Sequence, residues 1–325
     1  MLLSSACGVR PPDCTRRGVF CIGLVTDSGS IQQGPNQQAW LGLQDAQAQG
    51  LADHIDYIQT MDARDRQANI QTFVRDGYDL IITVGPLMTD DTILAAQQNP
   101  GTKFIGIEQT ENGGLPNLTG LVFHEERSGF LAGALAALIT RTDHVAALCD
   151  SESVDAMRRY CDSFQAGARY AGAGVSTAVM YRTGADQGLF NDPDWGRAAA
   201  LQAVQNGADV VFAAGGNTAQ AALEAAAAQG ALVIGSETDQ YESLADARAR
   251  LVSSAVSDIR AGVRSLVVLA RQDQLPAGNF FGQVALAPFH DQDEQVAQSV
   301  KDQLTGLEQE LASDPIIDPV PFQNP

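Results

Sequence analysis

The stretch from residue 207 to residue 240 constrains the fold most strongly, because it contains one complete strand, glycine turn, helix and strand. Residues 209–213 (DVVFA) form a short apolar run, which is typical of a strand that is buried on both faces of a parallel sheet. Gly215 and Gly216 then allow a tight turn, since neither has a Cβ atom. This unit predicts a parallel α/β sheet.

Polar residues follow both strands of this unit. Asn217 or Thr218 can cap the helix after the glycine turn, and Glu237 and Asp239 lie just beyond the second strand, residues 232–234. In open α/β sheets the carboxyl ends of the strands are where ligands bind. The turn sequence AAGGNT matches neither GxGxxG nor GxxxxGK[ST], so the turn does not indicate a dinucleotide or nucleotide-triphosphate loop.

The remaining segments repeat the alternation of strand and helix, which predicts a doubly wound α/β fold. Asn191 or Asp192 can cap a helix that has Pro193 in its first turn. Val256 is expected in a helix that begins after residue 254. Further strands are expected at residues 19–26, 55–59, 80–84, 103–107, 119–123, 145–148, 176–181, 251–254 and 281–286, and further helices from Asn36, from Asp62 and over residues 126–140, 154–171 and 293–312.

Length and charge narrow the class of protein. A chain of 325 residues exceeds a typical single-domain size, so two lobes are expected. The net charge is −19, which argues against nucleic acid or an anionic membrane surface as a partner. After the N-terminus, no segment reaches the roughly 18 consecutive apolar residues that a membrane-spanning helix needs.

The N-terminal segment MLLSSACGVRPPDC has features of an export signal. Cys7 follows small residues, as does the lipidated cysteine in the tail of a bacterial lipoprotein signal. Residues 1–17 are therefore expected to be a signal remnant and lipid tether. The protein is then expected to be exported and anchored to the cell membrane through lipid alone.

Four cysteines remain if Cys7 carries lipid, and four cysteines allow three disulfide connectivities. Cys149 ends a strand and Cys161 enters the next helix, so we favour a bond between these two, with Cys14 and Cys21 as the other pair. The histidines are scattered along the sequence, and no two cysteines have CxxC spacing. No metal site is expected.

Acidic residues stand at three predicted strand ends: Asp27, Glu108 and Glu237, with Asp239 close behind the last. Each alone is typical of a helix cap or a loop, but together they indicate a cleft lined with hydrogen-bond acceptors. Phe190 is compatible with the core or with a stacking platform for a planar ligand. The sequence contains no nucleophile elbow, HExxH motif or kinase set, so no catalytic residue is predicted.

Five longer stretches resemble one family of proteins. They are GLVTDSGSIQQGPNQQAWLGL, KFIGIE, FHEERSGFLAGALAA, GLFNDPDWG and VFAAGGNT. Together they resemble the basic membrane protein family of lipid-anchored solute-binding proteins, whose members include purine nucleoside receptors of ABC importers. The likeness extends from about Val19 to the last helix.

The resemblance implies a type I periplasmic-binding fold, with two doubly wound Rossmann-like lobes and the ligand in the cleft between them. It implies three hinge crossings, near Phe123, Gln240 and Leu286. Lobe 1 would then comprise residues 18–122 and 241–285, and lobe 2 would comprise residues 123–240 and 286–325. The ligand contacts that it implies are Asp27, Asn36, Gly85, Glu108, Phe190, Gly215, Gly216, Glu237 and Asp239.

The resemblance also implies a small planar nitrogen-rich solute, either a purine nucleoside or a related base, and ABC permease subunits as partners, without a cofactor. Pro35 stands where nucleoside binders have a stacking phenylalanine, and Val256 stands where they have a ribose-contacting lysine. The family usually has aspartate where Glu108 and Glu237 stand. The alternatives are a ligand-sensing module for another heterocycle, such as riboflavin, and a nucleoside-processing enzyme that uses the clustered acids.

Overall fold

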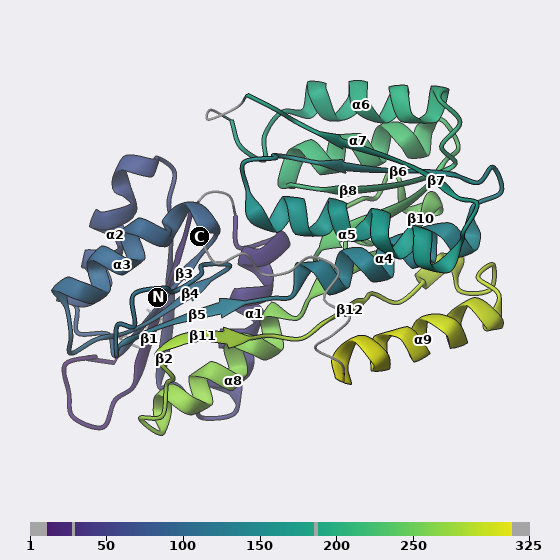
Figure 1. Cartoon of the computed structure of the whole chain (residues 1–325). Helices are drawn as coiled ribbons and strands as arrows, with labels where there is room; N and C mark the ends of the chain where they lie inside the picture. The colour runs from purple at the N-terminus through teal and green to yellow at the C-terminus, as the bar shows by residue number, and fades with distance from the viewer. Residues whose placement is uncertain (1–11, 28–29, 185–187, 314–325) are drawn as a thin grey trace, which may run out of the picture. The chain divides into compact units, whose positions relative to one another are not determined.

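The computed structural model describes residues 12–27, 30–184 and 188–313 (Figure 1). Cys7, the predicted lipidation site, lies outside these residues. The chain divides into two compact units, Met1–Val122 with Ile259–Gly282 and Phe123–Asp258 with Gln283–Pro325. Each unit contains one six-stranded sheet, which confirms the predicted α/β fold with two doubly wound lobes.

Unit 1 contains a fully parallel sheet with the strand order β11-β5-β4-β3-β1-β2. Its strands are β1 (Cys21–Thr26), β2 (His54–Gln59), β3 (Leu80–Val84), β4 (Lys103–Ile107), β5 (Leu118–Val122) and β11 (Gly278–Phe281). Its helices are α1 (Gly34–Ala48), α2 (Arg66–Arg75), α3 (Thr89–Gln98) and α8 (Ile259–Arg271), with short 3₁₀ turns η1 (Ala63–Asp65) and η2 (Pro86–Met88).

Helices cover both faces of this sheet (Figure 1). On one face, Ile70 and Phe73 of α2 pack with Cys21 and Val25 of β1, and α3 joins the same cluster. On the other face α1 and α8 pack together, and Gly262 of α8 lies against β5. Burial on both sides explains why β1, β3 and β5 are apolar runs without alternating polar residues.

Unit 2 repeats this design with the strand order β12-β10-β9-β8-β6-β7, in which only the edge strand β12 is antiparallel among the described residues. Its strands are β6 (His144–Cys149), β7 (Ser176–Tyr181), β8 (Val210–Ala214), β9 (Leu232–Glu237), β10 (Leu251–Ser257) and β12 (Val284–Leu286). Its helices are α4 (Glu125–Ile139), α5 (Asp155–Ala171), α6 (Pro193–Gln205), α7 (Gly216–Ala228) and α9 (Gln298–Ser313), with η3 (Arg248–Arg250) and η4 (His290–Gln292).

The second sheet divides its side chains between two helical layers. Val145, Ala147 and Cys149 of β6 pack on the side of α4, α5 and α9. Ala146 and Leu148 of the same strand pack on the side of α6 and α7. Successive residues of a strand point to opposite faces, so a strand between two apolar layers must be apolar throughout.

The predicted division of the lobes is wrong for residues 241–258 and 283–285, which belong to unit 2. These residues include β10, which pairs with β9 in the sheet of unit 2, and the chain passes to unit 1 between Asp258 and Ile259. Val256 accordingly lies in β10 and not in a helix. The predicted strand 281–286 is two strands, because β11 belongs to the first sheet and β12 to the second. The last helix begins at Gln298 rather than at residue 293.

Two predicted helix caps are also wrong, whereas a third is confirmed. Asn36 lies inside α1, whose N-cap is Gln33. Asn217 and Thr218 lie inside α7, whose N-cap is Gly215, two or three residues before the predicted caps. Asp192 caps α6 by accepting a hydrogen bond from the backbone N–H of Trp195.

Two disulfides are present among the described residues, one at the start of β1 and one at the end of β6. Cys149 is bonded to Cys161, and Cys14 is bonded to Cys21. Within the described ranges, no helix is both long and apolar enough to cross a membrane. The same part of the chain contains no cluster of histidine, cysteine and acidic side chains that could hold a metal ion.

Helices α4 and α5 approach each other unusually closely, because glycines occupy their interface. A Cβ atom on Gly129 would overlap the carbonyl oxygen of Tyr160, and one on Gly133 would overlap that of Phe164. From the opposite side, a Cβ atom on Gly167 would overlap the carbonyl oxygen of Phe130. The backbones are therefore in contact at points where no larger residue fits.

We expect Gly133→Ala to lower the free energy of unfolding by about 1–3 kcal/mol, because the added methyl group forces α4 and α5 apart. Gly306→Ala in α9 is the matched control, since no atom lies within 4 Å of the added Cβ. There the better helix propensity of alanine should stabilise the protein by about 0.5–1 kcal/mol. Urea denaturation of both variants measures the difference, and equal effects would contradict the close packing.

Candidate functional site

In unit 1 the carboxyl ends of three neighbouring strands lie together. Thr26 pairs with Val84 and Val84 pairs with Ile107, so the next residues along the chain, Asp27, Gly85 and Glu108, meet at one edge of the sheet. Backbone hydrogen bonds continue into these positions: the N–H of Asp27 donates to Val84 O at 3.2 Å, and the N–H of Gly85 donates to Ile107 O at 3.1 Å. The structure thus brings together three predicted site residues.

The chain turns sharply at two of these positions. Gly85 has φ 103°, and a Cβ there would lie 3.3 Å from the Cβ of Asp27. Glu108 has φ 60°, a left-handed conformation that is uncommon outside glycine. The buried side chain of Gln109 supports the turn by donating from Nε2 to Gly85 O and Thr83 Oγ1, each at 3.0 Å.

Asp27 has a charged partner within unit 1. Its carboxylate forms an ion pair with Arg66, at the start of α2, and the side chains are only 13% and 17% exposed. Burial raises the pKa of Asp27, although the guanidinium of Arg66 opposes this shift. A solute that binds Asp27 must therefore share it with Arg66. Asn36, also predicted to contact the solute, lies in the first turn of α1.

In unit 2 the ends of β6, β8 and β9 form a second such edge. Cys149 pairs with Ala214, so Asp150 and Gly215 follow side by side, and the N–H of Asp150 donates to Ala214 O at 3.0 Å. Glu237 ends β9, and its carboxylate accepts a hydrogen bond from the backbone of Gly215. Gly215 has φ 115°, and a Cβ there would lie 2.5 Å from Asp150 O, so only glycine fits this turn.

Glu237 has a perturbed carboxyl group. Burial and the nearby carboxylate of Glu125 together raise its pKa from 4.5 to about 7, although the hydrogen bond from the Gly215 backbone opposes the shift. Glu125 lies at the start of α4 and is itself buried, which raises its pKa against the effect of Arg159, whose Nε lies 2.8 Å from its Oε2. Near neutral pH, Glu237 can therefore donate a hydrogen bond as well as accept one.

Phe190 lies beside the glycine turn of unit 2. It is half-buried and packs against the core that α4 and α5 share with the sheet. Its backbone is left-handed, with φ 62°, and a Cβ on Gly216 would lie 2.8 Å from its carbonyl oxygen. Gly216 is therefore required for the approach of the Phe190 backbone to α7.

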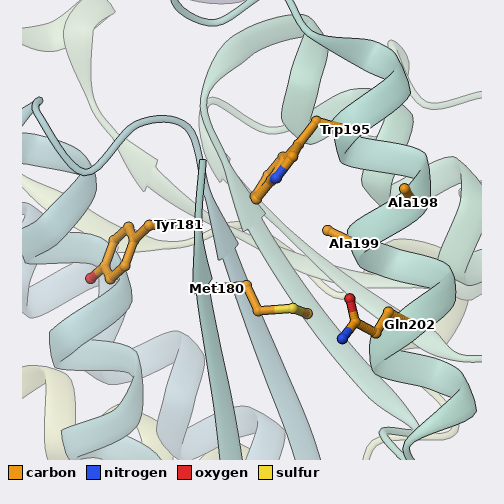
Figure 2. A pocket seen from close by; sticks show the side chains of 6 residues that line it. All are labelled: Met180, Tyr181, Trp195, Ala198, Ala199 and Gln202. Atoms are coloured by element: carbon orange, nitrogen blue, oxygen red, sulfur yellow. The ribbon is translucent and has the colours of Figure 1, made fainter. Parts of the chain in front are cut away.

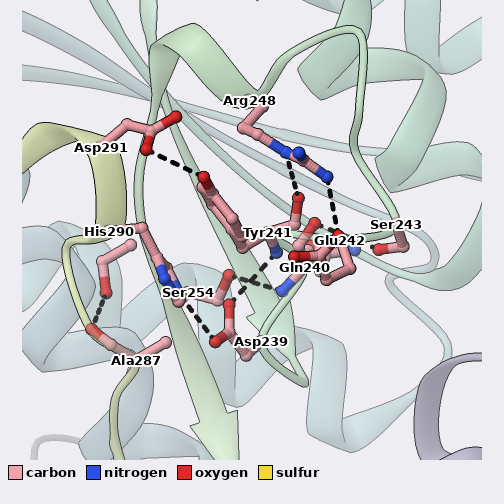
Figure 3. A network of polar contacts seen from close by, with 11 residues as sticks. Asp239, Gln240, Tyr241, Glu242, Ser243, Arg248, Ser254, Ala287, His290 and Asp291 are labelled. Atoms are coloured by element: carbon pink, nitrogen blue, oxygen red, sulfur yellow. Dashed lines mark hydrogen bonds and ion pairs between the residues drawn. The ribbon is translucent and has the colours of Figure 1, made fainter.

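Asp239 is part of a separate network (Figure 3). Its Oδ2 lies 2.8 Å from His290 Nε2, and its Oδ1 accepts from the N–H of Tyr241 at 3.2 Å. The ring of His290 stacks on Tyr241 with centroids 4.0 Å apart, and the Tyr241 hydroxyl donates to Asp291 at 2.9 Å. Both carboxylate oxygens of Asp239 thus bind groups that fix the loop between β9 and β10 onto η4.

A surface pocket of about 330 Å³ lies elsewhere in unit 2 (Figure 2). It is formed by the edge strand β7 and helix α6, and none of the predicted site residues lines it. Its lining residues are Met180, Tyr181, Trp195, Ala198, Ala199 and Gln202.

Several residues that support the strand ends were missed in the sequence analysis. Gln240 folds back so that its Oε1 accepts from Ser236 N at 3.1 Å, and a Cβ on Gly235 would overlap this side chain. Gln109 lies over Gly106 in the same way in unit 1. The pattern IGxE, with a glutamine one residue later in IGIEQ and three residues later in IGSETDQ, is the sequence signal that could have found both turns. Arg66, Glu125, Asp150, Arg159, Arg182 and Thr218 had no such signal.

Chemically, the two edges offer carboxyl groups, turned backbone and one aromatic ring. Three predicted site residues, Glu108, Phe190 and Glu237, have positive φ values of 60°, 62° and 67°. Such conformations cost about 1–3 kcal/mol each and concentrate at ligand-binding sites. Taken by itself, each edge suits recognition of a polar group by hydrogen bonds, and the edge of unit 2 also offers a ring for stacking.

Comparison with known proteins identifies the family. Residues 20–281 match the family model described as "ABC transporter substrate-binding protein PnrA-like". A protein of Listeria monocytogenes named CD4+ T-cell-stimulating antigen is 27% identical over 235 residues, which are 69% of this chain and 64% of that protein. The ABC transporter nucleoside-binding protein BmpA of Lactococcus lactis is 28% identical over 200 residues, 59% of this chain and 54% of that protein. The chain thus matches less than two thirds of the length of either relative.

The fold has solved counterparts as well. A solute-binding protein of an ABC transporter system from Aeropyrum pernix K1 superimposes with a TM-score of 0.75 at 18% identity, covering 90% of this chain and 91% of that one. At this identity the likeness shows the fold alone. The family match, in contrast, extends over residues 20–281, which include all strands of the first sheet and five of the six described strands of the second. The chain belongs to the family of PnrA-like ABC transporter substrate-binding proteins.

Proposed function

We propose that this protein is the extracytoplasmic solute-binding component of an ABC importer, and that residues of both units bind one small planar solute rich in nitrogen. The observation that carries the proposal is the pair of strand-end clusters, Asp27 with Gly85 and Glu108 in unit 1 and Gly215 with Glu237 in unit 2. The matching family model supports the transport role. Lipidation of Cys7 would hold the protein at the membrane, where permease subunits would receive the solute.

A purine nucleoside or a related base is the solute class that fits best. The name of the lactococcal relative states that it binds nucleosides. Phe190 offers a ring for stacking on a planar heterocycle, and carboxyl groups suit the exocyclic amines and hydroxyls of such ligands. Val256, which stands where nucleoside binders have a ribose-contacting lysine, pairs with Glu237 in the sheet. The residue that replaces this lysine therefore lies directly beside the proposed site. A free base or a flavin, which needs no ribose-contacting cation, therefore belongs in any ligand screen.

An enzymatic role is the second candidate, and the raised pKa of Glu237 is the observation that favours it. A carboxyl group with a pKa of about 7 is suited to general acid catalysis near neutral pH. Incubation with nucleosides, followed by chromatography for free base, separates the two functions. If wild type releases free base and Glu237→Gln does not, the protein is an enzyme. If the nucleoside stays intact, solute binding remains as the function.

Solute binding should be measurable on the purified chain and should depend on Phe190. We expect isothermal titration calorimetry against adenosine, guanosine, inosine, adenine and riboflavin to show one bound molecule per chain. Phe190→Ala should weaken the best of these by about 1–3 kcal/mol through loss of stacking. Phe190→Leu retains apolar volume without the ring and should also weaken binding. Tyr170→Ala, which removes an aromatic side chain that is 64% exposed on α5, is the control and should not.

If the wild-type protein binds none of these compounds in calorimetry, the proposed solute class is contradicted. Equal affinity of Phe190→Ala and the wild type would return this ring to a purely structural role in the core of unit 2.

The stability of the protein should depend on pH through Glu237. Between about pH 4.5 and pH 7, folded Glu237 keeps a proton that the unfolded chain releases, so stability should fall as pH rises through this window and level off above it. The slope is at most about 1.4 kcal/mol per pH unit. Glu237→Gln cannot titrate and should lack this contribution, whereas Glu294→Gln, at an exposed position, should keep it. Urea denaturation from pH 5 to pH 8 measures the free energy of unfolding at each pH. If this free energy changes with pH in the same way in wild type and Glu237→Gln, the raised pKa is refuted.

A further inference from the structure

A buried charged network holds the loop that carries Phe190. We call residues 188–192 the Phe190 loop. Asp150 is completely buried and Arg182 is 6% exposed. Arg182 Nε donates to Asp150 Oδ1 at 2.9 Å, and the hydroxyl of Thr218 donates to Asp150 Oδ2 at 2.6 Å. Both oxygens of the carboxylate are therefore used inside the protein, and they fix one arginine and one threonine.

The same arginine and threonine bind both ends of the Phe190 loop. At its start, Arg182 Nη2 donates to Gly188 O at 2.7 Å. At its end, the N–H of Asp192 donates to Thr218 Oγ1 at 2.8 Å, and Arg182 Nη1 lies 3.5 Å from Asp192 Oδ2. Asp150 thus orients two side chains, and each of these in turn fixes loop backbone.

The middle of the loop is seated on the first turn of α7. The N–H of Thr218 donates to Phe190 O at 3.3 Å, and Asn217 Nδ2 donates to Asn191 Oδ1 at 3.0 Å. Because Gly216 has no side chain, the left-handed backbone of Phe190 can approach this turn. Phe190 is therefore held at its own carbonyl group as well as through both ends of the loop.

Stability alone is a weak reason for such a network. Burying an ion pair removes both charges from water, and well-packed apolar residues of the same volume often stabilise a protein as much or more. What apolar residues do not provide is direction: each hydrogen bond of Asp150, Arg182 and Thr218 fixes one geometry. A loop that is already ordered loses less conformational entropy when a ligand binds to it.

We propose that Asp150, Arg182 and Thr218 are positioning residues for solute binding, which hold the Phe190 loop in its binding conformation before the solute arrives. The proposal rests on the proposed function, in which Phe190 contacts the solute. None of the three needs to touch the solute. They act through the place that they give to Phe190.

The test uses substitutions of Thr218, because its hydroxyl joins Asp150 to the loop without carrying charge. Thr218→Val keeps the shape and removes the hydroxyl, whereas Thr218→Ser keeps the hydroxyl and should behave as wild type. Tyr181→Phe is the matched control. It removes the hydrogen bond from the Tyr181 hydroxyl to Asp162 Oδ1, 2.6 Å long, next to Arg182 but without any bond to the loop.

The first measurement is hydrogen exchange of the full chain without added solute. In Thr218→Val, the amides of Asn191 and Asp192 should exchange about tenfold faster than in wild type. The substitution removes the hydrogen bond from Asp192 N–H to the Thr218 hydroxyl, and the loss of such a bond raises the population of the open loop by about this factor. Thr218→Ser and Tyr181→Phe should leave their exchange unchanged. Unchanged exchange in Thr218→Val would overturn the positioning role.

The second measurement is a double-mutant cycle with Phe190→Ala, read by calorimetry with the tightest of adenosine, guanosine, inosine and riboflavin. Thr218→Val should weaken binding about tenfold when Phe190 is present and have little effect in Phe190→Ala. An equal loss in both backgrounds, or no loss despite faster exchange, would overturn the link to the solute. If wild type binds none of the probes, the proposed function fails, while hydrogen exchange still decides whether the network orders the loop.

Discussion

The register of the parallel strands is the constraint on which the rest of the structure depends. When neighbouring strands are parallel and in step, the residues that follow them meet at one edge, however far apart they are in sequence. In unit 1 this register joins Asp27, Gly85 and Glu108. In unit 2 it joins Asp150 and Gly215, with Glu237 bound to Gly215. The helices that bury both faces of each sheet hold this register, because the side chains of a slipped strand would no longer fit those packed against them.

The strand-end turns carry costs that the surrounding structure offsets. Glu108 and Glu237 have left-handed backbones, and Gln109 and Gln240 fold back over the strand glycines beside them. Unit 2 adds buried charge, since Asp150 lies without exposure next to Arg182. Strain and desolvated charge both lower stability unless partners surround them. Their concentration at the carboxyl edges of the sheets supports the proposed binding of a solute there.

Apolar runs and glycines were sufficient to predict the fold class and most elements, and residues 80–84, 103–107 and 176–181 form strands with the predicted bounds. The motifs also gave the family that the comparisons show. Local sequence patterns failed where the secondary structure of a segment depends on the strand that it pairs with. Residues 251–257 become a strand of unit 2 because they pair with β9, and residues 281–286 divide because two sheets each take a part. The network around Asp150 was not predictable, because Arg182 and Thr218 are distant from Asp150 in sequence and contact it only in the folded chain.

The central claim is that strand ends of both units bind the same solute molecule. Native mass spectrometry of the chain with a pooled set of nucleosides, bases and flavins tests it most directly, with one substitution in each unit: Glu108→Gln in unit 1 and Glu237→Gln in unit 2. The account predicts a single bound molecule per wild-type chain and a smaller bound fraction in each variant. Two independent bound molecules, or a bound fraction that responds to only one unit, would contradict it.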